Sequence, residues 1–195
     1  MTGKLKLLLG ALVSVNLLAV LWVGVLAPRL EAAAQASIGR GDYALEVTDG
    51  STFTYASLAE GPSAVFFGFT YCPDVCPTTL GDILTWQEIL GDESEDLNIY
   101  FMTVDPERDT ADVLVEYVGW VPGVVGVTGA PDEVTKAIDA FKVYAAKVDL
   151  DEGEYTMDHT ASILLFDREG RYSDRISFQE DPDMALGKLR ALINS

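Results

Sequence analysis

An uncharged run of 21 residues, Leu7 to Ala27, constrains this chain most, because water is a poor solvent for so long an apolar segment. At about 1.5 Å per residue the run forms a helix of about 31 Å, close to the hydrocarbon thickness of a bilayer. Trp22 lies near its distal end, where aromatic side chains favour the membrane interface. The run therefore predicts a transmembrane anchor. A cleaved signal peptide is the alternative, since small residues around Ala34 offer cleavage sites, but its apolar core is usually about 7–15 residues.

The charges that flank this run predict its orientation. Lys4 and Lys6 lie on the N-terminal side, so the positive-inside rule keeps residues 1–6 in the cytoplasm as a short tip. Residues 7–27 then cross the membrane once, and the rest of the chain lies outside the cytoplasm. The Arg-rich character of a mitochondrial transit peptide is absent from these first residues. We therefore expect a bacterial inner-membrane protein with its C-terminal domain in the periplasm.

The overall charge excludes one large class of partners. The chain has 31 acidic and 13 basic residues, and its formal net charge is −18. Binding to nucleic acid needs clustered Lys and Arg to neutralise phosphates, so no nucleic-acid partner is expected. The acidity otherwise indicates a soluble, self-repelling surface, with docking to a basic partner as the alternative.

The remainder of the chain predicts one α/β domain. Residues 28–41 are expected to form an Ala-rich, partly helical linker, and residues 42–195 the folded domain. Apolar runs, alternation and turn signals predict a hairpin around Asp49-Gly50 and further strands at 63–69, 97–104, 124–129, 161–167 and 172–178. Helical spacing and end signals predict helices at 78–90, 110–120, 131–141 and 182–193. Strands that alternate with helices, followed by an antiparallel hairpin, indicate a mixed central sheet.

Two cysteines, Cys72 and Cys76, stand between a predicted buried strand and a predicted helix. Residues four apart share one face of a helical turn, so both sulfurs can point the same way. A helix N-terminus stabilises thiolates, the form that binds metals and attacks disulfides. An ordinary disulfide is the structural alternative, although a bridge across so short a loop constrains the unfolded chain little. Spacing alone leaves a structural disulfide and a reactive or metal site equally open.

His159 is the one histidine of the chain, and it precedes the predicted strand 161–167. Most isolated histidines are surface or core residues, but strand ends in α/β sheets gather at the functional edge. Two thiolates and an imidazole would form a soft three-ligand site that suits copper(I), whereas structural zinc usually takes four protein ligands. Met157 is expected to pack in the core, with weak ligation as the alternative. Asp158 could orient the imidazole.

Three stretches of the sequence resemble, in order and spacing, the signatures of the Sco (SenC-type) copper-assembly family. They are GFTYCPDVCPTTL (68–80), TVDPERDT (103–110) and DHTASILLFD (158–167), and the resemblance covers residues 42–193. It implies a thioredoxin-like fold, an extracytoplasmic domain, and copper bound as Cu(I) or Cu(II). Carried over by motif, the implied copper ligands are Cys72, Cys76 and His159, with Asp74 and Asp158 at neighbouring positions that could support them.

The resemblance also implies a role in assembling the binuclear copper (CuA) centre of cytochrome c oxidase subunit II. The expected protein is a copper metallochaperone and not an enzyme, with subunit II and a second periplasmic copper chaperone as partners. A thiol-disulfide reductase with Cys72 and Cys76 as its redox pair is the main alternative. A peroxiredoxin-like peroxidase and a purely structural anchor protein are the others. For the 103–110 segment, a turn capped by Asp109 or Thr110 is expected, and the resemblance implies that it also shapes the surface beside the cysteine loop.

Overall fold

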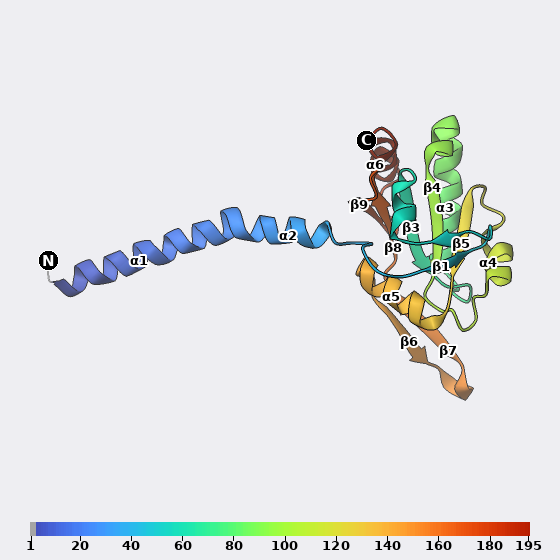
Figure 1. The fold of residues 1–195 in the computed structure, drawn as a ribbon, viewed down its shortest axis with the longest axis horizontal. Coiled ribbons are helices and arrows are strands. Elements are labelled where there is room, and N and C mark those ends of the chain that lie inside the picture. Colours follow the sequence, from blue (N-terminus) through green and yellow to red (C-terminus); the bar gives the residue numbers. More distant parts are fainter. Residues whose placement is uncertain (1–2) are drawn as a thin grey trace. The chain divides into compact units, whose positions relative to one another are not determined.

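The computed structural model describes residues 3–195 and divides the chain into an N-terminal unit that ends at Ser37 and a compact unit, Ile38–Ser195 (Figure 1). The N-terminal unit contains α1 (Gly3–Leu21), a π-helical turn η1 (Trp22–Leu26) and α2 (Ala27–Gln35), and it ends in a turn. Pro28 lies in the first turn of α2, where its missing N–H is tolerated. Within the described residues, one helical stretch, Ala11–Gln35, is long and apolar enough to cross a membrane.

The compact unit is built on a seven-stranded mixed sheet with the order β2-β1-β5-β4-β3-β8-β9. Its three central strands are parallel: β3 (Ser63–Gly68), β4 (Asn98–Thr103) and β5 (Val124–Thr128). The outer strands are antiparallel to their neighbours: β1 (Leu45–Val47), β2 (Thr52–Phe53), β8 (Ser162–Phe166) and β9 (Tyr172–Ser177). The predicted mixed sheet is therefore confirmed, as is the first hairpin, whose turn contains Gly50 at φ +86°.

Helices cover both faces of this sheet because its central strands are apolar on both sides. All six residues of β3 are buried. Helices α3 (Val75–Leu90) and α6 (Pro182–Ile193) contact each other on one face, and α4 (Ala111–Val118) packs on β5. Helix α5 (Pro131–Phe141) covers the other face, where the ring of Phe141 meets the edges of Phe67 and Phe166 at 5.2 and 5.5 Å. Such aromatic pairs each add about 0.5–1.5 kcal/mol to the burial term.

A separate two-stranded ribbon, β6 (Ala145–Asp149) and β7 (Tyr155–His159), is absent from the predicted elements. Its residues are exposed or only partly buried. Its sequence therefore lacks the alternation of apolar and polar residues that predicts a strand packed against the core. The antiparallel register pairs Ala145 with His159, which therefore ends a strand and does not lie in a loop. Three short 3-10 turns complete the unit: η2 (Tyr55–Ala59), η3 (Gly91–Asp96) and η4 (Asp151–Gly153).

Candidate metal centre

The two cysteines lie where β3 gives way to α3, at the carboxyl end of the central strands. Helix α3 begins at Val75, three residues before the predicted start, so Cys76 lies in its first turn. The backbone N–H of Cys76 donates a hydrogen bond to the sulfur of Cys72 at 3.3 Å. Both cysteines are free thiols, and both are buried, with 9% of Cys72 and 0% of Cys76 exposed. The loop therefore holds both sulfurs on one side, as the four-residue spacing predicts.

Gly68, the last residue of β3, makes room for the Cys76 sulfur. A Cβ atom at this position would lie 2.8 Å from Cys76 Sγ and 2.8 Å from the ring of Phe101. Real Cβ atoms almost never approach other atoms so closely, so a side chain here would displace the sulfur or the ring. The missing side chain of Gly68 thus lets the sulfur lie directly on the backbone of the central strand.

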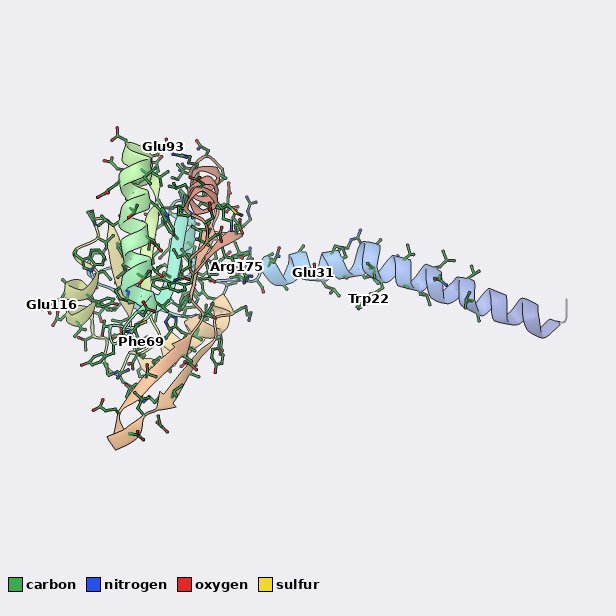
Figure 2. All side chains as sticks on the ribbon, turned by 180° about the vertical axis from the view of Figure 1, so that it is seen from behind. Trp22, Glu31, Phe69, Glu93, Glu116 and Arg175 are labelled. Carbon is green, nitrogen blue, oxygen red and sulfur yellow. The ribbon has the colours of Figure 1, made fainter. Side chains whose placement is uncertain are left out.

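His159 reaches this site from the end of β7. Its Nε2 lies 3.6 Å from Cys76 Sγ, and its Nδ1 lies 3.1 Å from the carbonyl oxygen of Thr160. Because a carbonyl oxygen only accepts hydrogen bonds, Nδ1 is the protonated nitrogen and Nε2 presents a lone pair to the sulfur. The ring is enclosed by Phe66 and Phe69, whose centroids lie 6.4 and 5.7 Å away; Figure 2 labels Phe69 near the cysteine end of α3.

The ligand atoms of Cys72, Cys76 and His159 all lie within 4.8 Å of one another. Two sulfurs and one imidazole nitrogen are a soft donor set, which suits copper(I) or another thiophilic ion better than a hard cation such as Mg²⁺. The sequence proposed these three residues as a group, and the structure brings them together.

The two thiols differ in acidity because one donates to the other. The side-chain hydrogen bond from Cys76, aided by the backbone N–H groups of Cys76 and Asp74, lowers the pKa of Cys72 to about 4, against the opposing effect of burial. The same bond and burial in an apolar site raise the pKa of Cys76. At neutral pH the pair therefore consists of a thiolate at Cys72 and a thiol at Cys76, and a bound metal would displace the second proton.

The two aspartates considered as supporting residues both lie exposed at the edge of the site. Asp74 precedes α3, where its carboxylate accepts a 3.5 Å hydrogen bond from Thr78 and its backbone N–H helps to lower the pKa of Cys72. Asp158 precedes His159 in β7, so its side chain points to the opposite face of the ribbon. Among the residues that the structure describes, it is the carbonyl oxygen of Thr160 that orients the imidazole ring. Met157 packs against the core, as expected.

A network that sequence reasoning missed ties the ribbon to the cysteine loop. Arg108 forms an ion pair with buried Asp105 and donates to the carbonyl oxygen of Tyr155 at 3.0 Å. The Tyr155 hydroxyl donates to the same Asp105 carboxylate at 2.9 Å. The guanidinium also stacks on two rings, 3.7 Å from the centroid of Tyr155 and 4.6 Å from that of Tyr71, the residue before Cys72. One side chain of the 103–110 segment therefore connects both halves of the candidate site.

The side chain of Asp109 anchors the start of the cysteine loop, the segment between β3 and α3. Its buried carboxylate accepts hydrogen bonds from the backbone N–H and hydroxyl of Thr70 at 3.0 and 2.6 Å, and from the hydroxyl of Thr103 at 2.7 Å. Burial nevertheless raises the pKa of this carboxyl group. The helix cap is Thr110, whose hydroxyl accepts from Val113 N at 3.4 Å. Of the two predicted caps, Thr110 is therefore the one that caps, and Asp109 supports the loop.

Comparison with known proteins decides the family. The SCO1/SenC family model matches residues 31–194. The chain belongs to the SCO1/SenC family. A SCO2-like protein of Rickettsia prowazekii is 39% identical over 135 residues, which cover 68% of this chain and 66% of that protein. The match therefore spans just under two thirds of that relative's length.

Solved structures of SCO1/SenC proteins share the fold. ScoI of Bradyrhizobium japonicum, solved with copper bound, is 39% identical, with a TM-score of 0.73 over 80% of this chain and 99% of that one. Yeast Sco1, also solved with copper bound, is 32% identical, with a TM-score of 0.73 over 82% of this chain and 90% of that one. The predicted thioredoxin-like fold with a mixed sheet is thus confirmed.

Proposed function

We propose that this SCO1/SenC protein is a copper metallochaperone that helps assemble the CuA centre of cytochrome c oxidase subunit II. Copper is its cargo, held by the sulfurs of Cys72 and Cys76 and by Nε2 of His159. The observation that carries the proposal is the convergence of these three atoms within 4.8 Å, with the imidazole in the tautomer that a metal requires. The copper-bound structures of ScoI from Bradyrhizobium japonicum and of yeast Sco1 support copper as the ion.

The differing exposure of the two sulfurs suggests an order of release. Cys72 is partly accessible and Cys76 is fully buried, so an incoming thiolate of subunit II reaches the bond to Cys72 first. Each exchange replaces one soft ligand with another, so the copper never passes through water as a free ion. Loading requires loss of the Cys76 proton, because only the thiolate binds metal. A second periplasmic copper chaperone is the proposed donor.

A thiol-disulfide reductase that acts on the same target is the second candidate, and the unequal acidity of the two thiols favours it. Cys72, whose pKa is about 4, is the thiolate that attacks a target disulfide to form a mixed disulfide. The Cys76 thiol then loses its proton and attacks Cys72. This step closes a Cys72–Cys76 disulfide and releases the target as a dithiol. His159 accepts no electrons in this cycle, so the reaction does not require it as a ligand.

Anaerobic titration of Cu(I) into the reduced full-length protein in detergent tests the first candidate. We expect one tight equivalent, with much weaker binding in Cys72→Ser, Cys76→Ser and His159→Ala. Met157→Leu is the matched control, because Met157 packs against the core beside the site and should leave the affinity unchanged. If His159→Ala bound Cu(I) as tightly as wild type, the result would favour the reductase. Absence of specific Cu(I) binding by wild type would refute the chaperone function.

The proposed domain organisation places this chemistry outside the cytoplasm. Residues 1–6 form a cytoplasmic tip, 7–27 a single inner-membrane span, 28–41 a linker and 42–195 the periplasmic copper-binding domain. The apolar Ala11–Gln35 helix and the bacterial relatives support this arrangement. Protease added to spheroplasts should digest the C-terminal domain. Full protection would contradict the orientation, and an N-terminus that is missing from the mature protein would indicate a cleaved signal peptide.

A further inference from the structure

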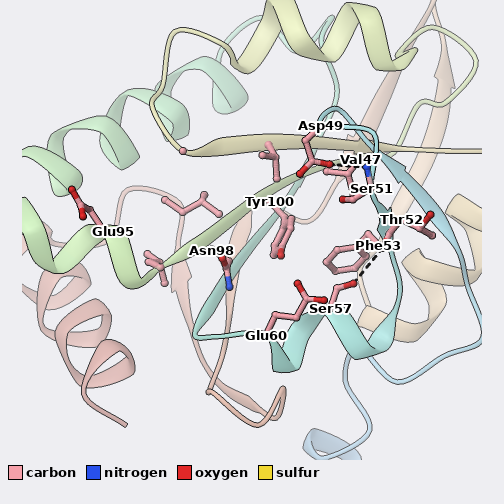
Figure 3. Close-up of a pocket in the computed structure, with 14 residues that line it drawn as sticks. Val47, Asp49, Ser51, Thr52, Phe53, Ser57, Glu60, Glu95, Asn98 and Tyr100 are labelled. Atoms are coloured by element: carbon pink, nitrogen blue, oxygen red, sulfur yellow. Dashed lines mark hydrogen bonds between the residues drawn. The ribbon is translucent and has the colours of Figure 1, made fainter.

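A second recessed site lies at the amino ends of β3 and β4, whereas the candidate metal centre lies at their carboxyl ends. It is a cleft of about 390 Å³ between the β1–β2 hairpin, η2, η3 and β4 (Figure 3). This volume falls within the range of about 300–1,000 Å³ that is usual for small-ligand sites. Apolar side chains of the core, including Phe53, Ile99 and Val125, form part of its wall, and three carboxylates surround it.

Tyr100 presents a hydroxyl group to this cleft. The residue is only 8% exposed, and its hydroxyl has no hydrogen-bond partner in the part of the chain that the structure describes. In Figure 3 the ring projects into the cleft with its hydroxyl on the side of Glu60. The ring of Phe53 holds it by an edge contact with 4.8 Å between centroids. With no protein partner among the described residues and an opening to the cleft, the hydroxyl is available to form a hydrogen bond with a ligand that enters.

The carboxylates around the cleft lack cationic partners of their own. Asp49, Glu60 and Glu95 form no ion pair with any residue that the structure describes. Asp49 accepts a 2.8 Å hydrogen bond from the backbone N–H of Ser51, which fixes its position at the rim. Burial of the phenol and the nearby charges of Glu60 and Asp49 raise the pKa of Tyr100, so its hydroxyl stays protonated and neutral. Acidic groups with an apolar wall and a free hydroxyl match a cation on an alkyl chain.

We propose that this cleft binds a primary alkylammonium group, with the Tyr100 hydroxyl accepting a hydrogen bond from it and Glu60 and Asp49 balancing its charge. The alkyl chain would pack along Phe53. The group belongs either to a free diamine or to a lysine side chain of a partner protein. Binding here is independent of copper, because the cleft shares no residue with the Cys72, Cys76 and His159 site.

Calorimetric titration of the full-length protein in zwitterionic detergent tests this site. The probes are putrescine for the free diamine and Nα-acetyl-lysine methylamide for the protein side chain, with butanol as the uncharged comparison. We expect saturable 1:1 binding of at least one amine and none of butanol. Tighter binding of putrescine would identify a free diamine, and tighter binding of the lysine derivative a partner protein. Absence of binding by both amines would overturn the proposal.

Three variants locate the binding. Tyr100→Phe keeps the ring but removes the hydroxyl and should weaken binding at least about tenfold, since a hydrogen bond to a charged group contributes about 1.5–3 kcal/mol. Glu60→Gln removes one exposed charge and should weaken binding about twofold to fivefold. Glu116→Gln is the control, because it removes the same charge from exposed α4 outside the cleft. Equal weakening in Glu116→Gln and Glu60→Gln would indicate nonspecific attraction to the acidic surface and would overturn the proposal. Unchanged unfolding temperatures would show that the variants fold.

Discussion

Replacing Gly68 with alanine should disturb both the fold and the candidate metal centre, because the new Cβ would occupy the space of the Cys76 sulfur. The atom would lie 2.8 Å from the sulfur and 2.8 Å from Phe101, about 0.6 Å short of the 3.4 Å at which ordinary contact begins. Neither neighbour can yield easily, since Cys76 and Phe101 are both fully buried. Overpacking of this kind destabilises a protein by about 1–3 kcal/mol. Alanine loses less backbone entropy than glycine on folding, which offsets about 0.5–1 kcal/mol of that loss.

We therefore expect Gly68→Ala to lower the free energy of unfolding by about 1–2 kcal/mol, or the unfolding temperature by about 2–8 °C. Displacement of the Cys76 sulfur should also weaken Cu(I) binding about tenfold, the scale seen when the support of a metal ligand is lost. Circular dichroism on heating gives the unfolding temperature. Competition with a Cu(I) chelator gives the affinity.

Gly81→Ala is the matched control, because Gly81 lies on the same helix as Cys76 and a Cβ there would meet nothing within 4 Å. It should raise stability by about 0.5–1 kcal/mol through helix propensity and leave Cu(I) binding unchanged. The reasoning would be refuted if Gly68→Ala were as stable as wild type and bound copper equally well. Loss of stability with unchanged affinity would refute the link between this contact and the sulfur's position.

Three further changes test the surroundings of the candidate site. Arg108→Met should destabilise the protein by about 3–5 kcal/mol in thermal unfolding, because it leaves the buried Asp105 carboxylate without its ion-pair partner. The double variant Arg108→Met with Asp105→Asn should recover part of this loss. Additive effects of the two substitutions would contradict the pairing. Iodoacetamide should alkylate Cys72 at a rate that is constant between about pH 6 and 8, because its pKa of about 4 makes it a thiolate throughout, whereas a rate that rises tenfold per pH unit would refute the thiolate. Burial raises the pKa of Asp109 in the folded state. The protonated side chain therefore stabilises the fold fully below the unfolded carboxyl pKa of about 3.9, and this stabilisation is lost as the pH rises through the pKa of the folded state. Asp109→Asn should accordingly flatten the pH dependence of the unfolding temperature above about pH 4, and an unchanged slope would count against this assignment.

Much of the framework could be predicted from the sequence because its signals are local. The apolar run of β3, the cysteine spacing and the proline at the start of α5 each specify an element through nearby residues. The β6–β7 ribbon could not be predicted in this way. Its strands are half-exposed, and contacts distant in sequence hold it, such as the stacking of Arg108 on Tyr155. For the same reason the sequence placed His159 correctly near the cysteines but could not predict that Thr160 would orient it.

The ribbon's separation from the main sheet has a further consequence for local motion of the domain. Cys72 and Cys76 are attached to the rigid body of the domain, whereas His159 stands on β7, whose strand pairing is with β6 alone. His159 nevertheless pairs with Ala145 at the base of the ribbon, three residues before β8, so outward motion of the Tyr155 end would leave the imidazole in place and every strand of the seven-stranded sheet paired. The resistance to that motion resides in side-chain contacts such as the Arg108 stack, and local openings of this kind cost less than global unfolding. Such an opening would expose the ring of Tyr155 while the strand pairing of the core stayed intact.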